Sequence, residues 1–259
     1  MIRTLLKKDL SNCNCTLLTM SLLFLGSVVL VIGELGIVHG TEFFSKNDNP
    51  FDIAYAEWVE RYWMWWIAVT PEQSEPSNGS CLINRSDSMV MLLNPAIGGE
   101  HQLECDISSN EGIMVPSWSG FFENNDKDDE PDNTPVEQLS KLAKEQVNTG
   151  AVTSDVKVDG KSVARLDEIT DMSNNVLNYK VNVMNNFTEI YTRPFNITIP
   201  ENTNLPDQAI GTWPAGAQGW FAFIKPLSIG DHEVSYTLSV QGLGEDNVAS
   251  QITYTLHVK

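Results

Sequence analysis

The sequence predicts a mainly β protein, an antiparallel β-sandwich with two accessory α-helices, and an α+β fold is the alternative. Three observations carry this prediction. From residue 151 onward, apolar and polar side chains alternate with a period of two, as in strands with one buried face. Turn signals such as Asp159-Gly160 and Gly242-Leu243-Gly244 recur at short spacing. Helical periodicity is confined to residues 50–70 and 134–149.

The first predicted helix, residues 50–70, has Asn49 as its cap and Pro50 in its first turn, and it ends before Pro71. Its apolar side chains recur at helical spacing: Tyr55, Trp58, Tyr62, Trp65, Trp66 and Val69, widened by Trp63 and Ile67. Such a stripe can stack sugars or lie on a membrane, but only a narrow charged stripe remains beside it. We therefore expect a helix that packs against the strands of the C-terminal half, with Trp58 and Trp65 buried.

The second predicted helix, residues 134–149, has Thr134 as its cap, Pro135 as its first residue and Glu137 as the capping-box partner. Gly150 ends it. The runs that read as strands are 89–93, 102–107, 113–115, 156–158, 181–184, 195–199, 220–224, 234–240 and 252–258. Together these elements predict a single exported domain over residues 41–259, with its strand-rich half at 151–259.

Residues 1–40 read as a signal peptide or an N-terminal membrane anchor. Basic residues precede an apolar run at 16–33, which at 1.5 Å per residue is about 27 Å long. Val38-His39-Gly40 permits cleavage before Thr41, whereas the length of the run favours an uncleaved transmembrane helix. Both readings place the rest of the chain outside the cytoplasm, as a secreted, cell-surface or periplasmic protein.

The composition narrows the classes of partner. The chain has 259 residues, 42% of them hydrophobic, which suffices for a core. Its net charge of −18 argues against nucleic acid, because phosphate binding needs clustered Lys and Arg. We expect other cell-envelope components as partners, with divalent cations as bridges, and a membrane only through an uncleaved N-terminal segment.

Cysteine and asparagine patterns fit an exported protein. Cys81 and Cys105 are the two cysteines after the apolar run, and we expect them to form a structural disulfide. A metal site that combines Cys105 with His101 is the alternative and needs further ligands. Four candidate glycosylation sites follow the apolar run, at Asn78, Asn84, Asn186 and Asn196, which is close to the number that chance gives.

Two further metal hypotheses rest on spacing. Asp126, Asp128, Glu130 and Asp132 alternate in an acidic stretch, and hard oxygen ligands at that spacing suit Ca²⁺. The EF-hand glycine and distal Glu are absent, so a flexible acidic loop is the favoured interpretation. Copper binding to sulfur would use methionines, of which Met89 and Met91 lie on one strand face, but buried core explains them too. The other methionines that bear on this hypothesis are Met114, Met172 and Met184.

An ordered set of segments resembles an uncharacterised family of secreted prokaryotic proteins. The set comprises Tyr55-Ala56-Glu57-Trp58, Trp63-Met64-Trp65-Trp66, Cys81, Cys105, Gly112-Ile113-Met114-Val115-Pro116, Val158-Asp159-Gly160 and Lys225 to His232. The resemblance implies a Trp-rich N-terminal helix, two cysteines and a β-rich C-terminal half that ends in a Gly-x-His turn. The resemblance therefore implies an exported protein with this fold, and it implies no enzymatic activity because the family has no established reaction.

Catalytic motifs are sparse, so whether the chain is an enzyme stays open. No nucleophile elbow, zinc-binding helix or phosphate loop is present in the sequence. Asp231-His232 would fit a triad with a serine, but His232 more simply closes a turn by bonding to the backbone. We therefore predict a structural or binding role. The alternatives are a copper-handling protein and an extracellular hydrolase with a carboxylate pair such as Glu189 and Asp231.

Overall fold

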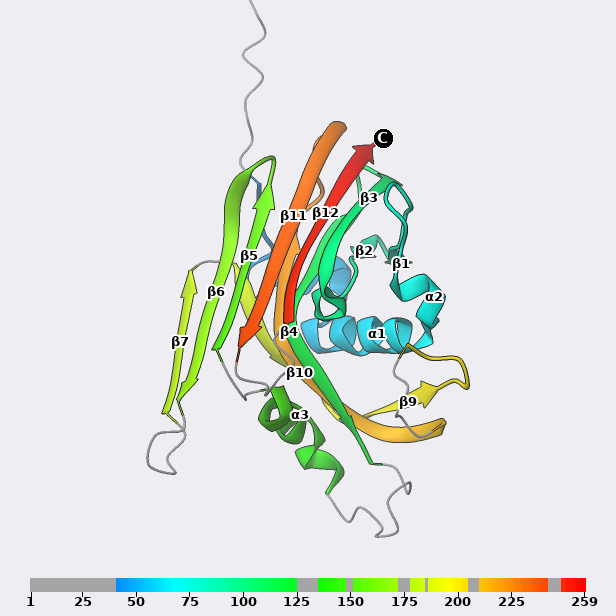
Figure 1. Cartoon of the computed structure of the whole chain (residues 1–259), viewed down its shortest axis with the longest axis vertical. Helices are drawn as coiled ribbons and strands as arrows, with labels where there is room; N and C mark the ends of the chain where they lie inside the picture. The colour runs from blue at the N-terminus through cyan, green and yellow to red at the C-terminus, as the bar shows by residue number, and fades with distance from the viewer. Residues whose placement is uncertain are drawn as a thin grey trace, which may run out of the picture. The chain divides into compact units, whose positions relative to one another are not determined.

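Two six-stranded sheets form the fold (Figure 1). Sheet A has the strand order β1-β2-β4-β10-β8, and β9 also pairs with β10; sheet B has the order β3-β12-β11-β5-β6-β7. The strands of sheet A are β1 (Asn84–Ser86), β2 (Met89–Met91), β4 (Gly112–Glu123), β8 (Phe187–Tyr191), β9 (Phe195–Ile199) and β10 (Gly211–Ile224). Those of sheet B are β3 (Gly99–Ile107), β5 (Ala151–Val158), β6 (Lys161–Asp171), β7 (Asn178–Met184), β11 (Gly230–Gln241) and β12 (Val248–Val258).

The helical elements are η1 (Pro50–Asp52), α1 (Tyr55–Ala68), α2 (Pro71–Ser74), η2 (Pro95–Ile97), η3 (Val136–Gln138) and α3 (Leu139–Val147). The computed structural model describes residues 41–124, 135–147, 151–171, 178–184, 186–204, 210–241 and 248–259, without the side chains of 145–147, 168–171 and 178–184. The described residues from Thr41 onward form one compact unit. Within the described ranges no helix is long and apolar enough to cross a membrane, and the apolar run at 16–33 lies outside them.

The β-rich fold is confirmed, but the sheets are not purely antiparallel. β12 pairs in parallel with β3, and β2 pairs in parallel with β4. The reason lies in the path of the chain: β3 belongs to sheet B, whereas β2 and β4, its neighbours in sequence, belong to sheet A. The chain therefore crosses between the sheets before and after β3. Such crossings leave no trace in a period-two pattern.

Helix α1 is a core element, as the sequence predicts, although its bounds differ. Phe51 and Asp52 have positive φ (54° and 63°), which breaks the helix that Pro50 was expected to begin, so α1 starts only at Tyr55. Its C-terminal carbonyls are capped from a distant loop: Thr203 Oγ1 donates to Ile67 O, and Asn204 Nδ2 donates to Trp66 O.

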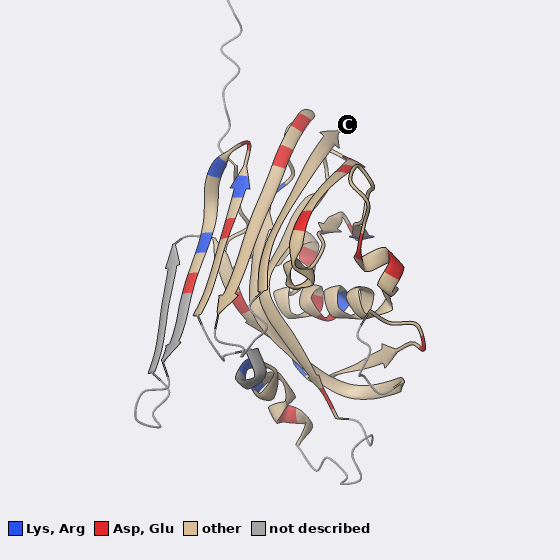
Figure 2. Ribbon diagram, in the orientation of Figure 1, with Lys and Arg blue, Asp and Glu red and all other residues tan. Residues whose placement is uncertain are grey.

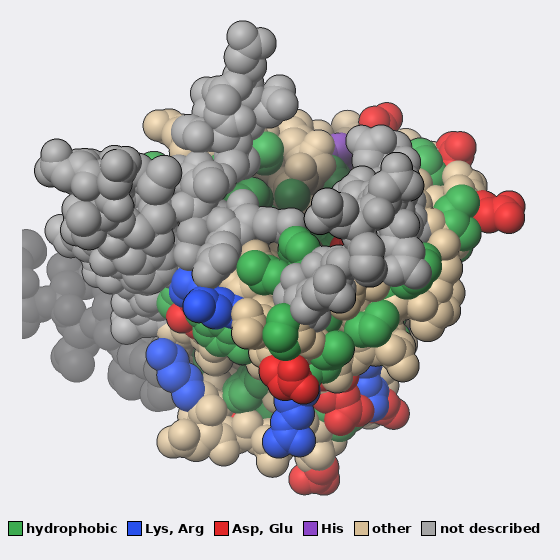
Figure 3. Space-filling model, turned by 90° about the horizontal axis from the view of Figure 1, so that it is seen from below, with side chains coloured by type: hydrophobic (Ala, Val, Ile, Leu, Met, Phe, Trp, Pro, Cys, Tyr) green, Lys and Arg blue, Asp and Glu red, His purple; other side chains and the backbone are tan. Residues whose placement is uncertain are grey.

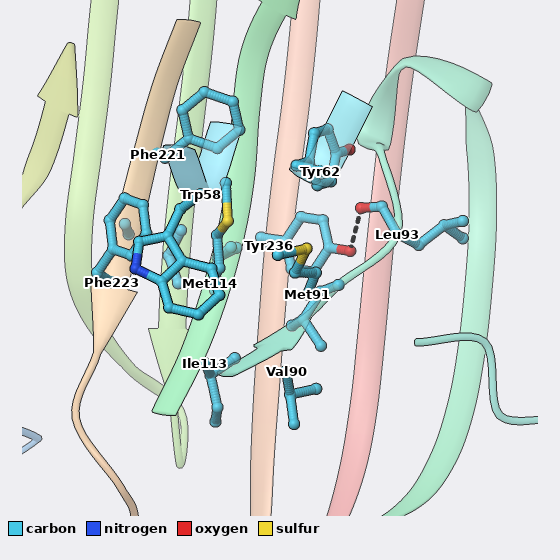
Figure 4. Close-up of a cluster of buried hydrophobic side chains, with 14 of the residues drawn as sticks. Trp58, Tyr62, Val90, Met91, Leu93, Ile113, Met114, Phe221, Phe223 and Tyr236 are labelled. Atoms are coloured by element: carbon cyan, nitrogen blue, oxygen red, sulfur yellow. Dashed lines mark hydrogen bonds between the residues drawn. The ribbon is translucent and has the colours of Figure 1, made fainter. Parts of the chain in front are cut away.

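The buried face of α1 packs on the C-terminal strands. It consists of Trp58, Val59, Tyr62, Trp63, Trp66 and Ile67. Figure 4 shows Trp58 and Tyr62 among Phe221, Phe223 and side chains of both sheets, and the Tyr62 ring lies edge-on at 5.6 Å from that of Phe221. Trp65, which was expected in the core, is only partly buried, whereas Trp63 is buried. The helix is thus rotated slightly from the expected orientation.

Strands β4 and β10 are longer than their sequence suggests, because both faces of each are covered. Residues 112–119 of β4 and 215–224 of β10 are buried without a break, so apolar and small residues follow one another and the alternation disappears. Pro116 lies within β4, beyond the predicted strand at 113–115. The register of the β4–β10 pair shifts between Gly219 and Phe221, opposite Pro116, and this irregularity accommodates the missing N–H.

The second predicted helix exists as η3 followed by α3. Pro135 precedes the helical turns and is not their first residue, and Thr134 and Gly150 lie outside the described residues. α3 lies directly on sheet A, because Gly216 of β10 has no side chain: a Cβ there would approach Ser140 N to 2.3 Å. The close approach lets Ser140 Oγ donate to Thr192 O.

The expected disulfide between Cys81 and Cys105 is present, with its Cα atoms 5.1 Å apart. It joins the segment after α2 to the outer strand of sheet B. Gly79 N donates to Gln102 O and Glu104 N donates to Ser80 O, so residues 79–80 cover part of the free edge of β3.

Replacing Trp58 by Ala tests the core position of α1. We expect the free energy of unfolding to fall by about 3–5 kcal/mol, through lost contacts and the cavity left behind. Met64, which is 43% exposed on the same helix, is the control, and Met64→Ala should change stability by no more than about 0.5 kcal/mol. Urea unfolding measures both; equal effects of the two changes would contradict the buried orientation.

The disulfide is tested by its contribution to stability. The double change Cys81→Ser and Cys105→Ser should cost about 3.5 kcal/mol in the chain-entropy model for a loop of 24 residues. In the oxidised protein, a thiol reagent added after unfolding should leave both cysteines unmodified, and after reduction it should label both. Labelling of both without reduction would show that the bond is absent.

Candidate functional site

Ser228, His232 and Asp159 come together at one corner of the fold, and we call them the Ser228 site. Ser228 Oγ lies 3.2 Å from His232 Nε2, and His232 Nδ1 lies 2.9 Å from Asp159 Oδ2. His232 Nε2 is also 3.0 Å from the carbonyl oxygen of Ser228. The serine is exposed, while the side chain of His232 is only 15% exposed.

The site is built by two turns that are distant in sequence. Asp159 and Gly160 have φ of 50° and 73°, as a tight hairpin turn between β5 and β6 requires, and this confirms the predicted hairpin. Asp159 N donates to Glu233 O, and Glu233 N donates to Asp159 Oδ1 at 3.0 Å. One carboxylate oxygen of Asp159 is thereby fixed on the backbone, and the other faces His232.

A cavity of about 350 Å³ adjoins the site. Its lining comprises Thr41, Glu42, Val158, Asp159, Lys225, Pro226, Leu227, Ser228 and His232. One wall comes from the start of the described chain, because Phe44 N donates to Phe223 O and Lys225 N donates to Glu42 O. The cavity therefore combines an apolar wall, the Ser228 site and one ion pair, Lys225 with Glu42 at 3.3 Å.

The partners of His232 determine its protonation pattern. Asp159 can only accept, so Nδ1 carries the proton that faces it. In the neutral ring Nε2 is then an acceptor and binds the hydroxyl of Ser228; in the charged ring Nε2 donates to the carbonyl of Ser228. The arrangement of nucleophile, base and orienting carboxylate is that of a serine triad.

The sequence predicts part of this site. It indicates His232 with a serine partner, and a bond from His232 to the backbone, which the Ser228 carbonyl provides. It paired His232 with Asp231, and that was wrong: Asp231 binds His257 instead. Along β11 the side chains of Asp231 and His232 point to opposite faces of the sheet, so neighbours in sequence cannot act together. Asp159 was named only as a turn residue.

A second polar cluster lies across the outer face of sheet B. His257 Nδ1 donates to Asp231 Oδ1 at 2.7 Å, and Nε2 donates to Glu104 Oε1 at 2.9 Å. Both bonds require the doubly protonated ring. Hydrogen bonds to Asp231 and then to Glu104 raise the pKa of His257 above its ordinary value. The cation thus links β11, β12 and β3.

The carboxylates of the predicted hydrolytic pair, Glu189 and Asp231, do not share a site: they lie on sheets A and B. Asp231 binds His257, as above. Glu189 Oε1 is paired with Lys144 of α3 and accepts from Gln218 Nε2 and Tyr191 Oη, each at 3.0 Å. This cluster fixes α3 to sheet A.

The other predicted sites divide into three groups. Met89, Met91 and Met114 are fully buried, and Asn84 Nδ2 donates to the sulfur of Met91 at 3.6 Å, so these methionines belong to the core. Cys105 is disulfide-bonded and His101 lies against Gly98 O, which excludes their use as a joint metal site. Asp126, Asp128, Glu130, Asp132 and Met172 fall outside the described residues, as does the side chain of Met184.

Within the described ranges, no group of three His, Cys, Asp or Glu residues is arranged to hold a metal ion.

The four asparagines of the candidate glycosylation sites differ in exposure. Asn78, Asn186 and Asn196 are exposed, and Asn84 is half-buried in β1. Seen from below, the described part of the surface shows apolar side chains interspersed with charged ones (Figure 3).

The raised pKa of His257 makes the stability of the fold depend on pH. A raised pKa means that the stabilisation is present below the ordinary value, about 6.5, and is lost as the pH rises through the folded-state pKa. We therefore expect the melting temperature of the wild type to exceed that of His257→Gln at about pH 5.5, and the difference to shrink toward about pH 9.

Thermal unfolding across this range measures the difference. The control is the same His257→Gln change in a background that carries Asp231→Asn and Glu104→Gln, where the pH-dependent difference should vanish. A difference that stays constant or grows with rising pH would contradict the assignment of both bonds to the cation.

Comparisons with known proteins assign no family to this chain. No protein-family model matches the chain, and no curated protein sequence matches it either. Two segments of the ordered set noted above, Val158-Asp159-Gly160 and Lys225 to His232, meet at the Ser228 site.

Proposed function

We propose that the chain is an exported protein of the cell surface or periplasm with a binding role, and that it binds neutral glycans of the envelope on the outer face of sheet B. The observation that carries this proposal is a strip of uncharged polar side chains on a chain of net charge −18. The strip consists of Ser235, Thr237 and Ser239 on β11 and of Gln251, Thr253 and Thr255 on β12.

These residues share one face because strand side chains alternate. Along β11, Val234, Tyr236 and Leu238 are buried, while the serine and threonine side chains between them are half-exposed. The register places Thr237 opposite Gln251 and Ser235 opposite Thr253. The hydroxyl and amide groups thus form adjacent rows in the middle of a sheet whose other face lies in the core.

An open groove of about 450 Å³ lies on this part of the sheet. Its lining comprises Gly99, Glu100, Thr237, Leu238, Ser239, Ala249, Ser250 and Gln251. Hydroxyl and amide groups both donate and accept hydrogen bonds, so such a surface matches a ligand that presents many hydroxyl groups.

The charged side chains that border the strip are mostly acidic, with the basic Lys157 of β5 opposite Ser235, and they indicate the charge of the ligand. Glu100 and Glu104 lie on β3, and Asp231 and Glu233 lie at the start of β11, where Figure 2 shows acidic colour beside the tan centre. Carboxylates repel anionic polymers and accept hydrogen bonds from sugar hydroxyls. A neutral polysaccharide is therefore favoured over an acidic one.

The buried orientation of α1 also supports a binding surface elsewhere. Its tryptophans would be the natural platform for sugar rings, but Trp58, Trp63 and Trp66 lie in the core. The same burial speaks against membrane binding through this helix. The proposal that the chain is exported rests on the apolar run and its basic flank within residues 1–40.

Electrophoresis through native gels that contain a neutral glucan, mannan or galactan tests the function. We expect at least one of them to retard the wild type, and alginate, an acidic polymer, to have no such effect. Thr237→Glu places a bulky charge in the groove and should weaken retardation at least about fivefold, since a lost hydrogen bond is worth about 1 kcal/mol.

The matched control is Thr212→Glu, which adds the same charge to an exposed threonine of β10 in sheet A. This variant should be retarded like the wild type. Absence of retardation by all three neutral polymers would refute the binding role, and an equal loss in both variants would refute the location.

A further inference from the structure

The Ser228 site contains chemistry that glycan binding on the outer face does not use. It lies on a different surface, because the side chain of His232 points to the opposite face of β11 from Ser235 and Thr237. We propose that Ser228 is an activated nucleophile that cleaves small carboxylic esters in the adjoining cavity. This activity goes beyond the binding role and stands or falls independently of it.

Two distances and one backbone hydrogen bond give each residue its role. The base lies at 3.2 Å from the serine hydroxyl, and its other nitrogen lies at 2.9 Å from Asp159. Asp159 is held by the Glu233 amide, so it orients the ring with the unprotonated Nε2 toward Ser228. A serine with only a structural role in its turn would not require a histidine oriented by a carboxylate 73 residues away in sequence, in the turn between β5 and β6.

The carbonyl of Ser228 stabilises the protonated form of His232. When the hydroxyl gives its proton to Nε2, the ring becomes a cation whose new N–H finds an acceptor at 3.0 Å in that carbonyl. Asp159 stabilises the cation from the other side. Besides His232, the ionisable residues that line the cavity are Asp159, Glu42 and Lys225.

The size and lining of the cavity define the substrate class. About 350 Å³ is at the low end for ligand pockets and suits a short acyl chain. Val158, Pro226 and Leu227 form an apolar wall for that chain, and Lys225 is the cation of the lining. The exposed Ser228 leaves room for a large alcohol component outside, so acylated glycans fit as well as small esters.

The reaction follows from these roles. Ser228 Oγ attacks the ester carbonyl carbon and forms the new C–O bond, while its proton moves to His232 Nε2. The bond from the carbonyl carbon to the alcohol oxygen then breaks, and Nε2 returns the proton to that oxygen. Water, deprotonated by Nε2, hydrolyses the acyl-serine and releases the carboxylic acid, and the proton returns to Ser228.

A fluorophosphonate probe tests the activation directly. An activated serine forms a P–O bond with the probe, the P–F bond breaks with loss of fluoride, and the serine proton passes to His232. We expect peptide mapping of the full chain to locate one label on Ser228, and p-nitrophenyl acetate to be hydrolysed. His232→Ala should lower both rates at least about a hundredfold, and Asp159→Asn should lower them as well.

The control is Ser77→Ala, which removes another exposed serine and should leave both rates unchanged. Native protein that leaves Ser228 unlabelled would overturn the proposal. So would labelling of Ser228 that persists at the same rate in His232→Ala, because the histidine would then not be the base. Neither result would affect the retardation assay for glycan binding.

Discussion

The fold depends on hydrogen bonds that two buried tyrosines make with a segment of backbone that enters the core. Tyr236 Oη donates to Leu93 O at 2.6 Å, Tyr254 Oη donates to Leu82 O at 2.6 Å, and Leu93 N donates to Tyr254 Oη at 3.2 Å. A buried carbonyl without a partner would cost about 1–3 kcal/mol. Burial raises the pKa of both tyrosines, so they remain protonated donors. They belong to sheet B and the segment leads into and out of sheet A, so these bonds join the sheets.

Around this polar contact the core is filled by the aromatic face of α1. Tyr62, Phe221 and Tyr236 lie near one another in Figure 4, on a helix, on sheet A and on sheet B respectively. Because α1 contacts both sheets, the packing of its side chains determines the distance and the angle between them. This explains why a mostly polar, strongly acidic chain still concentrates four of its seven tryptophans in one helix.

The sequence predicts well those features that one local pattern determines. The strands of sheet B with one exposed face, the hairpin at Asp159-Gly160 and the burial of Trp58 follow from periodicity and turn chemistry. It fails where burial on both faces removes the pattern, as in β4 and β10, and where positive φ at Phe51 and Asp52 delays the start of α1 to Tyr55. At the Ser228 site it identifies His232 but not Asp159, because strand pairing alone brings them together.

The position of β12 has a consequence for the order in which the protein can fold. β12 lies between β3 and β11, yet residues 248–258 follow every other strand of sheet B along the chain. Until these residues have been synthesised, β3 has no partner within its sheet and β11 exposes one edge. Folding during synthesis can then complete the hairpins β5–β6 and β6–β7 but not the sheet. During that interval the unpaired strand edges can pair with other chains, so rapid addition of β12 protects the protein from aggregation.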